Sequence, residues 1–194
     1  MQASAIVWSL IGVLAAVLLI YAIQIYNALV TLKHNVSKAW SNIDVLLKQR
    51  HDELPKLVDV CRRYMGYEQE TLARVMEARS QVAAAREGVD VGALGAAESR
   101  LRFGLGNLFA VAEAYPELKA DTTFRHLQDR ITALESSIAD RREYYNESVN
   151  LNNVRIEQFP DVIIAGKFGF KAFDLLEFSE REKVDVNVGE LFAG

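Results

Sequence analysis

The residues of this chain best suited to binding a metal or moving a proton near neutral pH are its three histidines. A di-iron centre in a helical bundle needs Glu-x-x-His pairs on two helices. Here the residues three positions earlier are not glutamates: Thr31 precedes His34, Lys48 precedes His51 and Thr123 precedes His126. The spacing gives no support to a metal centre, and we expect no metal and no cofactor.

Motifs for nucleophilic catalysis and phosphate binding are also missing from the sequence. It contains no CxxC, HExxH, GxSxG or glycine-rich phosphate loop. Its single cysteine, Cys61, lies in an apolar helical stripe and is typical of a small core residue. Gly104 and Gly106 fall inside a predicted helix and indicate close approach between helices. We expect no catalytic residue and predict that the protein is not an enzyme.

The elements that organise the chain begin with an apolar N-terminal stretch. Residues 1–32 contain no Asp, Glu, Lys or Arg. About 20 apolar residues in a helix span a hydrocarbon core of roughly 30 Å. The sequence therefore predicts a transmembrane anchor over residues 1–25. We expect its lipid-facing residues to include Ala3, Ile6, Trp8, Leu10, Leu14, Leu18, Ile20 and Ile23.

A cleaved signal peptide is the alternative interpretation of this stretch. Signal peptides have a basic start, a 7–15-residue apolar core and a small-x-small cleavage site. This apolar run is longer, lacks a basic start and ends in bulky residues at 23–26. We therefore expect the anchor to be retained.

Charge and composition limit which partners the protein can bind and indicate how it is oriented in the membrane. The 194 residues are 51% hydrophobic and carry a net charge of −4 with both signs interspersed, which does not suit nucleic-acid binding. Lys33 and Lys38 follow the anchor, and no basic residue precedes it. The positive-inside rule then favours a single-pass protein of the cell (inner) membrane, with its N-terminus outside and its helical domain in the cytoplasm.

Apolar residues recur at spacings of three and four through the rest of the chain, the pattern of helices with one buried face. Four such stripes run over residues 29–47, 54–82, 94–115 and 124–156. The sequence predicts an all-α protein: a transmembrane helix continuing into an antiparallel up-down four-helix bundle (residues 26–159). A short apolar segment and an extended tail follow (residues 160–194).

The boundary between the first two bundle helices has two interpretations. The apolar stripe keeps its phase through Pro55, which suggests one long kinked helix. Asp52 is a good N-cap, however, and would place Pro55 in the first turn of a new helix. Four segments of similar length can cover one another, so we predict a break near Asp52. The glycines at 88, 92 and 95 are predicted to form another break.

Three asparagines, Asn146, Asn150 and Asn153, flank the apolar stripe of the last bundle helix. A buried asparagine can fix the register between neighbouring helices. One hypothesis is a polar ladder against a neighbouring bundle, and the favoured alternative is a solvated flank.

The segment 162–173 is the second most apolar stretch of the chain. One hypothesis places it in the bilayer interface, with contacts from Lys167, Phe168, Phe170, Lys171 and Phe173. The alternative is that it folds back and caps the open end of the bundle. Beyond it, residues 183–188 alternate between apolar and polar and could add a strand to a partner's sheet, although a frayed terminus is favoured.

The stretch from Tyr26 to Phe178 resembles the LemA family of bacterial membrane proteins. The most specific matching run is Ala110–Ala120 (AVAEAYPELKA). Other matches are Tyr26-Asn27, Ala39–Val45, Arg50-His51-Asp52, Pro55, Leu57-Val58, Ala78-Arg79, Phe124, Leu127-Gln128, Tyr145-Asn146, Phe159-Pro160, Ala165-Gly166 and Phe168-Gly169-Phe170. The chain departs from the family at residues 53–56, where the family has a more apolar run ending in Asn, and at Tyr67-Glu68, where the family has His-Glu.

The resemblance implies a single membrane anchor followed by a helical bundle, and it brings no established catalytic activity. One branch of the family takes part in forming magnetosome membranes, and other members are found beside membrane proteases or stress genes. The leading hypothesis is a non-enzymatic scaffold that self-associates at a bacterial membrane, in membrane organisation or remodelling. The alternative is an accessory subunit of a membrane protease or stress-signalling complex. The expected partners are membrane lipid, further copies of the chain and a membrane protein.

Overall fold

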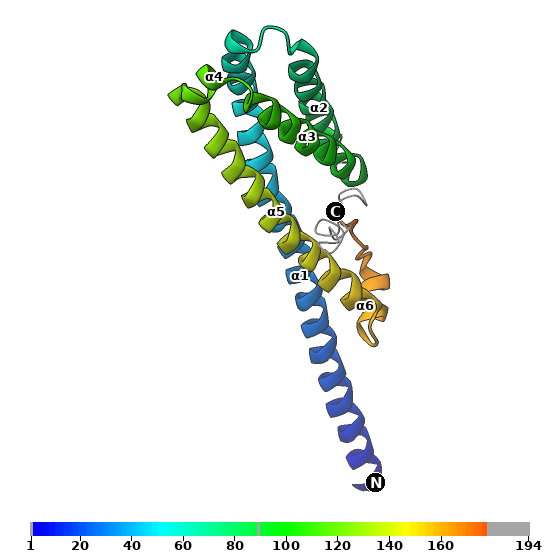
Figure 1. The fold of residues 1–194 in the computed structure, drawn as a ribbon. Coiled ribbons are helices and arrows are strands. Elements are labelled where there is room, and N and C mark those ends of the chain that lie inside the picture. Colours follow the sequence, from blue (N-terminus) through cyan, green and yellow to red (C-terminus); the bar gives the residue numbers. More distant parts are fainter. Residues whose placement is uncertain (1, 89, 178–194) are drawn as a thin grey trace, which may run out of the picture. The chain divides into compact units, whose positions relative to one another are not determined.

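The computed structural model describes residues 2–88 and 90–177, with side chains from residue 6 onward. The described residues form helices and contain no strand, which confirms the all-α prediction (Figure 1). The helices are α1 (Gln2–Tyr64), α2 (Gln69–Glu87), α3 (Val91–Ala112), α4 (Pro116–Ala120), α5 (Thr122–Glu157) and α6 (Asp161–Phe168). The alternating segment 183–188 lies outside the described residues.

The chain forms two compact units, and α1 and α5 contribute residues to both. We call residues 1–41 and 144–173 the anchor unit, because they include the predicted anchor. We call residues 42–143 and 174–194 the bundle unit.

The core of the bundle unit is built from the apolar stripes that the sequence predicts. Ile43, Leu54 and Leu57 of α1 are buried, as are the stripe residues of α2, α3 and α5: Leu72, Val75, Leu94, Leu101, Leu105, Leu108, Phe124 and Ile131. Capping residues define where two helices begin. The Asp90 carboxylate accepts a hydrogen bond from Ala93 N (2.8 Å) at the start of α3. Asp121 accepts from Thr123 N (2.7 Å) and Phe124 N (3.1 Å) at the start of α5.

The predicted break near Asp52 is wrong, because α1 continues through Pro55 to Tyr64. The first break after the anchor falls instead at residues 65–68. A proline inside a helix removes the hydrogen bond to the carbonyl four residues earlier, here that of His51. Arg79 of α2 supplies the missing donor, since its Nε lies 2.9 Å from the His51 carbonyl oxygen. A distant side chain thus satisfies the carbonyl that Pro55 leaves free.

The predicted glycine break is correct only at Gly88, the C-cap of α2. Gly92 and Gly95 lie within α3. A Cβ atom at Gly95 would stand 1.9 Å from the Glu177 carbonyl oxygen, so a side chain there would collide with the backbone. Gly95 is therefore required for close packing of the chain against α3, and not for a turn.

The anchor unit packs the end of α5 and the short helix α6 against α1. Ile25 and Leu29 of α1 form a buried cluster with Ala165 of α6, and Ile156, Ile164 and Phe170 pack around it. Gly169 ends α6 in the left-handed conformation (φ 72°), which glycine adopts at no steric cost. The chain then turns back, with Phe170 N donating to the Ala165 carbonyl oxygen (3.0 Å).

Candidate functional site

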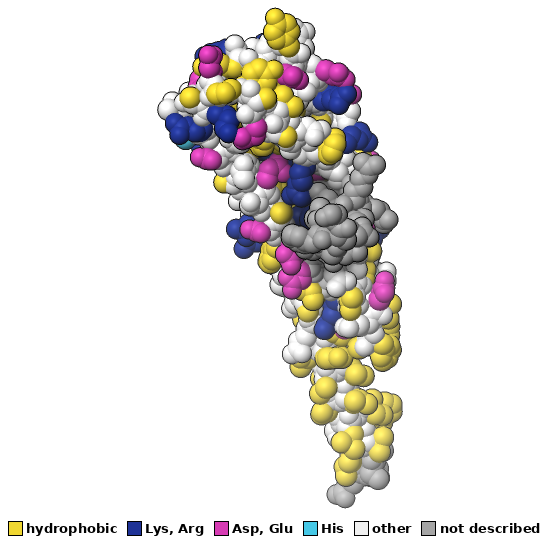
Figure 2. All heavy atoms as spheres, viewed as in Figure 1, with side chains coloured by type: hydrophobic (Ala, Val, Ile, Leu, Met, Phe, Trp, Pro, Cys, Tyr) yellow, Lys and Arg dark blue, Asp and Glu magenta, His cyan; other side chains and the backbone are white. Residues whose placement is uncertain are grey.

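The predicted anchor residues lie on α1 with their side chains exposed. Their exposed fractions are at least one half at every described position: Ile6, Trp8, Leu10, Leu14, Leu18, Ile20 and Ile23. The side chain of Ala3 lies outside the described part. This apolar stretch is long enough to cross a membrane, and none of it is buried against the rest of the described chain. Hydrophobic side chains gather along this part of α1 in the space-filling view (Figure 2).

Helix α6 holds an aromatic cluster where the apolar stretch of α1 ends. The ring of Tyr26 meets the rings of Phe168 and Phe170 edge-on, with centroids 4.9 and 5.7 Å apart. Phe170 is half-buried and Phe168 is more than half exposed. Lys167 and Lys171 are exposed. The structure thus brings four of the five predicted interface residues close to α6 and α1, with Phe173 farther along the returning chain.

The returning chain is held by asparagine side chains of α5. Asn153 Nδ2 donates to the Phe173 carbonyl oxygen (2.9 Å), and Phe173 N donates to Asn153 Oδ1 (3.0 Å). The buried Asn152 donates to the Lys171 carbonyl oxygen (3.2 Å). Of the other predicted ladder residues, Asn146 is half-buried and Asn150 is exposed. Asn153 therefore bonds within the chain, and Asn152, which the sequence did not single out, shares this role.

A cluster of charges is buried inside the bundle unit. Arg50 of α1, with 1% of its side chain exposed, lies 2.5 Å from carboxylate oxygens of Glu98 on α3 and Glu135 on α5. Glu98 is 3% exposed, and Glu135 also pairs with Arg102. Burial alone would lower the pKa of Arg50, but the two carboxylates more than offset it and raise the pKa. The guanidinium therefore stays charged and joins three helices.

Sequence reasoning missed this cluster, although the stripes contain its signal. Arg50 falls in the series Leu47, Arg50, Leu54, and Glu98 falls between Leu94 and Leu101. A charged residue at a stripe position is buried when its stripe is buried, and a buried charge needs a partner. Two opposite charges on two stripes therefore indicate an internal ion pair.

A second polar contact lies beside the His51 carbonyl oxygen, which has no helical hydrogen bond because of Pro55. Arg79 Nη2 donates to His51 Nε2 (2.6 Å), so that nitrogen must be the unprotonated acceptor. Burial and the charge of Arg79 lower the pKa of His51. His51 is thus held neutral as part of a helix–helix contact between α1 and α2.

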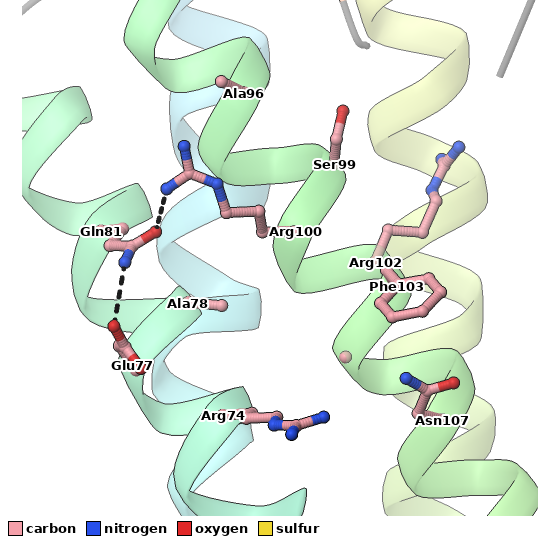
Figure 3. Close-up of a pocket in the computed structure, with 11 residues that line it drawn as sticks. Arg74, Glu77, Ala78, Gln81, Ala96, Ser99, Arg100, Arg102, Phe103 and Asn107 are labelled. Carbon is pink, nitrogen blue, oxygen red and sulfur yellow. Dashed lines mark hydrogen bonds between the residues drawn. The ribbon is translucent and has the colours of Figure 1, made fainter. Parts of the chain in front are cut away.

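A groove of about 770 Å³ runs between α2 and α3 of the bundle unit (Figure 3). Gln81 donates to Glu77 (3.3 Å) and accepts from Arg100 (2.6 Å), so a polar chain crosses from one helix to the other. The exposed ring of Phe103 lies on the α3 side. Three arginines and one glutamate line the groove: Arg74, Arg100, Arg102 and Glu77. These residues were not among the sequence predictions, because exposed arginines on helices are ordinary.

The cysteine and the possible metal-binding side chains of the described chain show no arrangement typical of a reactive site. Cys61 is fully buried, and burial raises the pKa of its thiol to about 12, so it remains protonated at neutral pH. Among residues 2–88 and 90–177, no three His, Cys, Asp or Glu side chains gather in a way that could hold a metal ion.

The exposed apolar helix and the packed helices define a helical-bundle protein of the membrane-associated class. The model of the LemA family matches residues 39–189, more than half of the chain. The protein belongs to the LemA family.

Relatives of this chain include named magnetosome proteins. It is 24% identical over 190 residues to magnetosome protein MamQ 2 of Paramagnetospirillum magneticum, covering 86% of this chain and 70% of that protein. It is 26% identical over 169 residues to magnetosome protein MamQ of Magnetospirillum gryphiswaldense, covering 75% and 62%. It is 28% identical over 167 residues to protein LemA of Metamycoplasma hominis, covering 85% and 74%.

Proposed function

We propose that this protein is a non-enzymatic scaffold, anchored by residues 1–25 in a bacterial membrane, whose copies associate side by side. The observation that carries the proposal is the exposed apolar stretch of α1, which has no partner inside the described chain and needs lipid around it. The similarity to the magnetosome proteins supports a role in membrane organisation. The buried charges of Arg50, Glu98 and Glu135 pair with one another and join helices, which is a structural role.

Self-association has a candidate surface on α5 within the anchor unit. Tyr144, Leu151 and Val154 are exposed apolar residues at spacings of seven and three, and Asn150 is exposed beside them. This is a second apolar stripe, distinct from the buried stripe of Tyr145 and Val149. Apolar residues at heptad spacing form the seam between paired helices, and a flanking asparagine can set their register. A second copy of the chain, presenting the same stripe, is the occupant we propose. Confinement to a membrane raises the local concentration and makes a modest affinity effective.

Cysteine crosslinking of the full-length protein in bacterial membranes tests this surface. Leu151→Cys and Val154→Cys are made in a Cys61→Ser background and treated with a short bifunctional maleimide. We expect a crosslinked dimer at both positions. Ser80→Cys, on the exposed side of α2, is the control and should stay monomeric. Equal dimer yields at all three positions would contradict a defined α5 interface.

The orientation of the bundle in the cytoplasm is part of the proposal and has its own test. Tyr67 is fully exposed in the turn between α1 and α2, so Tyr67→Cys reports which side of the membrane holds the bundle. A membrane-impermeant maleimide should leave this cysteine unlabelled in cells with an intact inner membrane and label it after permeabilisation. Labelling in intact cells would reverse the orientation.

A second candidate function is that of an adaptor for one membrane-protein partner, and the groove between α2 and α3 favours it. Arg100, which bonds the neutral Gln81, lies next to the exposed Phe103 and suits an acidic segment that carries an apolar residue. Arg74 and Arg102 already pair with Glu70 and Glu135. Crosslinking of the full-length protein in cells, followed by mass spectrometry, separates the two functions. A stoichiometric heterologous crosslink that disappears in Arg74→Glu with Arg100→Glu would favour the adaptor.

A further inference from the structure

An apolar surface lies where α5 turns into α6. Phe159 is 82% exposed, Ile163 is 59% exposed, and Val162 and Phe168 are also exposed. The buried face of α6 carries Asp161, paired with Arg155, and Ala165. The outer face of this short helix therefore carries large apolar side chains, which a helix facing water usually buries.

The contacts of α6 fix its depth relative to the proposed span. Residues 3–23, the central part of the proposed anchor (residues 1–25), form about 31 Å of helix, close to the thickness of the hydrocarbon core. Ile25, Tyr26 and Leu29, against which α6 packs, follow within two turns. Helix α6 contacts these residues through Ala165 and Phe168, so it lies near the boundary between hydrocarbon and headgroups, where aromatic and long basic side chains are favoured.

The charge of the anchor unit suits a negatively charged membrane surface. Its two segments contain five basic side chains and three acidic ones, a net charge of +2 in a chain whose net charge is −4. The exposed Lys167 and Lys171 belong to α6 and to the residues just after it. Lysines at this depth reach lipid phosphates while the aliphatic parts of their side chains stay in the apolar layer.

We propose that the turn between α5 and α6, together with the outer face of α6, inserts into one leaflet of the bilayer beside the span. Phe159 and Ile163 enter the acyl boundary, and Lys167 and Lys171 bind anionic headgroups. This inference rests on the proposed anchor, and the occupant is lipid. A helix inserted in one leaflet only displaces headgroups on that side, so the insertion gives the scaffold a preference for curved, anionic membrane.

The test uses the full-length protein in vesicles of phosphatidylcholine and phosphatidylglycerol. In the Cys61→Ser background, Phe159→Cys or Ile163→Cys carries an environment-sensitive nitrobenzoxadiazole dye. Vesicle flotation is measured first, followed by quenching with lipids whose doxyl group lies near the headgroup. We expect blue-shifted emission and at least about twofold stronger quenching than at Phe103→Cys, an exposed aromatic position of the bundle unit. Helical circular dichroism verifies that each labelled protein is folded.

The outcomes separate this inference from the anchor on which it rests. Flotation without quenching at either position would overturn leaflet insertion and leave the anchor intact. Failure to float would overturn both. Lys167→Glu with Lys171→Glu should weaken the quenching in anionic vesicles and leave it unchanged in pure phosphatidylcholine. Equal quenching of the native sequence and this double variant in anionic vesicles would overturn the headgroup contacts alone.

Discussion

The bundle unit and the anchor unit differ in the side chains that they leave exposed. The bundle unit buries the charges of Arg50 and Glu98 among leucines, while the anchor unit exposes Phe159 and Ile163. In the bundle unit, buried charges meet opposite charges from other helices. In the anchor unit, asparagine amides meet backbone groups of the returning chain.

This difference in exposed side chains indicates which medium surrounds each region. Water outside the bundle unit makes apolar burial favourable, so charges can be carried into the core only as pairs. In the proposed arrangement, lipid surrounds residues 1–25 and the outer face of α6. It removes that driving force there, so apolar side chains face outward and packing relies on satisfied polar groups. Substitutions should therefore cost most at charges in the bundle unit and least at amides in the anchor unit.

The largest effect is expected from Arg50→Leu. It leaves Glu98 buried without its partner, and breaking a buried pair in this way costs about 3–5 kcal/mol. Urea unfolding of the protein in detergent micelles, followed by circular dichroism, measures the loss. Arg62→Leu breaks an exposed pair with Asp59 and should cost at most about 1 kcal/mol. Similar losses for the two variants would refute the importance of the buried cluster.

Gly95→Ala is expected to follow, with a loss of about 1–3 kcal/mol, because its Cβ would collide with the Glu177 carbonyl oxygen. The matched control is Gly106→Ala in the same helix, where no atom lies within 4 Å of the new Cβ. That variant should gain up to about 1 kcal/mol from helix propensity. The same urea titration measures both variants. A change in the free energy of unfolding with the same sign in both would contradict the prediction.

Arg79→Met should destabilise the protein by about 1–3 kcal/mol, because the His51 carbonyl loses its donor. Pro55→Ala restores a backbone N–H that can bond the same carbonyl. In the Pro55→Ala background, Arg79→Met should therefore cost about 1 kcal/mol less. A double-mutant cycle from urea unfolding gives this coupling energy, and strict additivity would show that Arg79 does not replace the missing hydrogen bond.

A smaller and more local effect is expected from Asn153→Ala in the anchor unit. The variant loses both hydrogen bonds to the Phe173 backbone, worth about 1–2 kcal/mol together. Amide hydrogen exchange of residues 168–175 should speed up, while exchange in α3 stays unchanged. Asn150→Ala, at an exposed position, is the control and should leave exchange of the returning chain as it was.

The smallest effect is a pH dependence through His51, whose pKa is lowered in the fold. The unfolded chain then binds a proton more readily than the folded chain. The contribution of the neutral imidazole is complete above the ordinary pKa of about 6.5 and is lost as the pH falls toward the folded-state value. Urea unfolding between about pH 7 and 5 should show a smaller loss in His51→Gln than in the native sequence. An identical pH slope would contradict this role.

The helical class and most of the stripes could be predicted, because burial at spacings of three and four leaves a local signature. The break at Asp52 could not be ruled out locally. A capping residue followed by proline begins many helices, and the decisive contact comes from Arg79, 28 residues away. Gly95 was misassigned for the same reason, since its requirement comes from Glu177.

The candidate sites were predictable to different degrees. Lys167, Phe168 and Phe170 stood out because an apolar stretch near the chain end is rare enough to notice. The groove between α2 and α3 gave no signal, because Arg74 and Arg100 come together only when their helices pair. Arg50 and Glu98 did give a signal, which is a charge placed on an apolar stripe.

The buried cluster also bears on how the protein is made. Arg50 leaves the ribosome long before its partners, which follow 48 and 85 residues later at Glu98 and Glu135. A nascent or truncated chain that ends before α5 holds a guanidinium in an apolar stripe without its full set of counter-charges. Such a chain cannot close its core and keeps the surface that chaperones and proteases bind. The cluster thus ties closure of the core to the synthesis of both α3 and α5, which carry the two carboxylates.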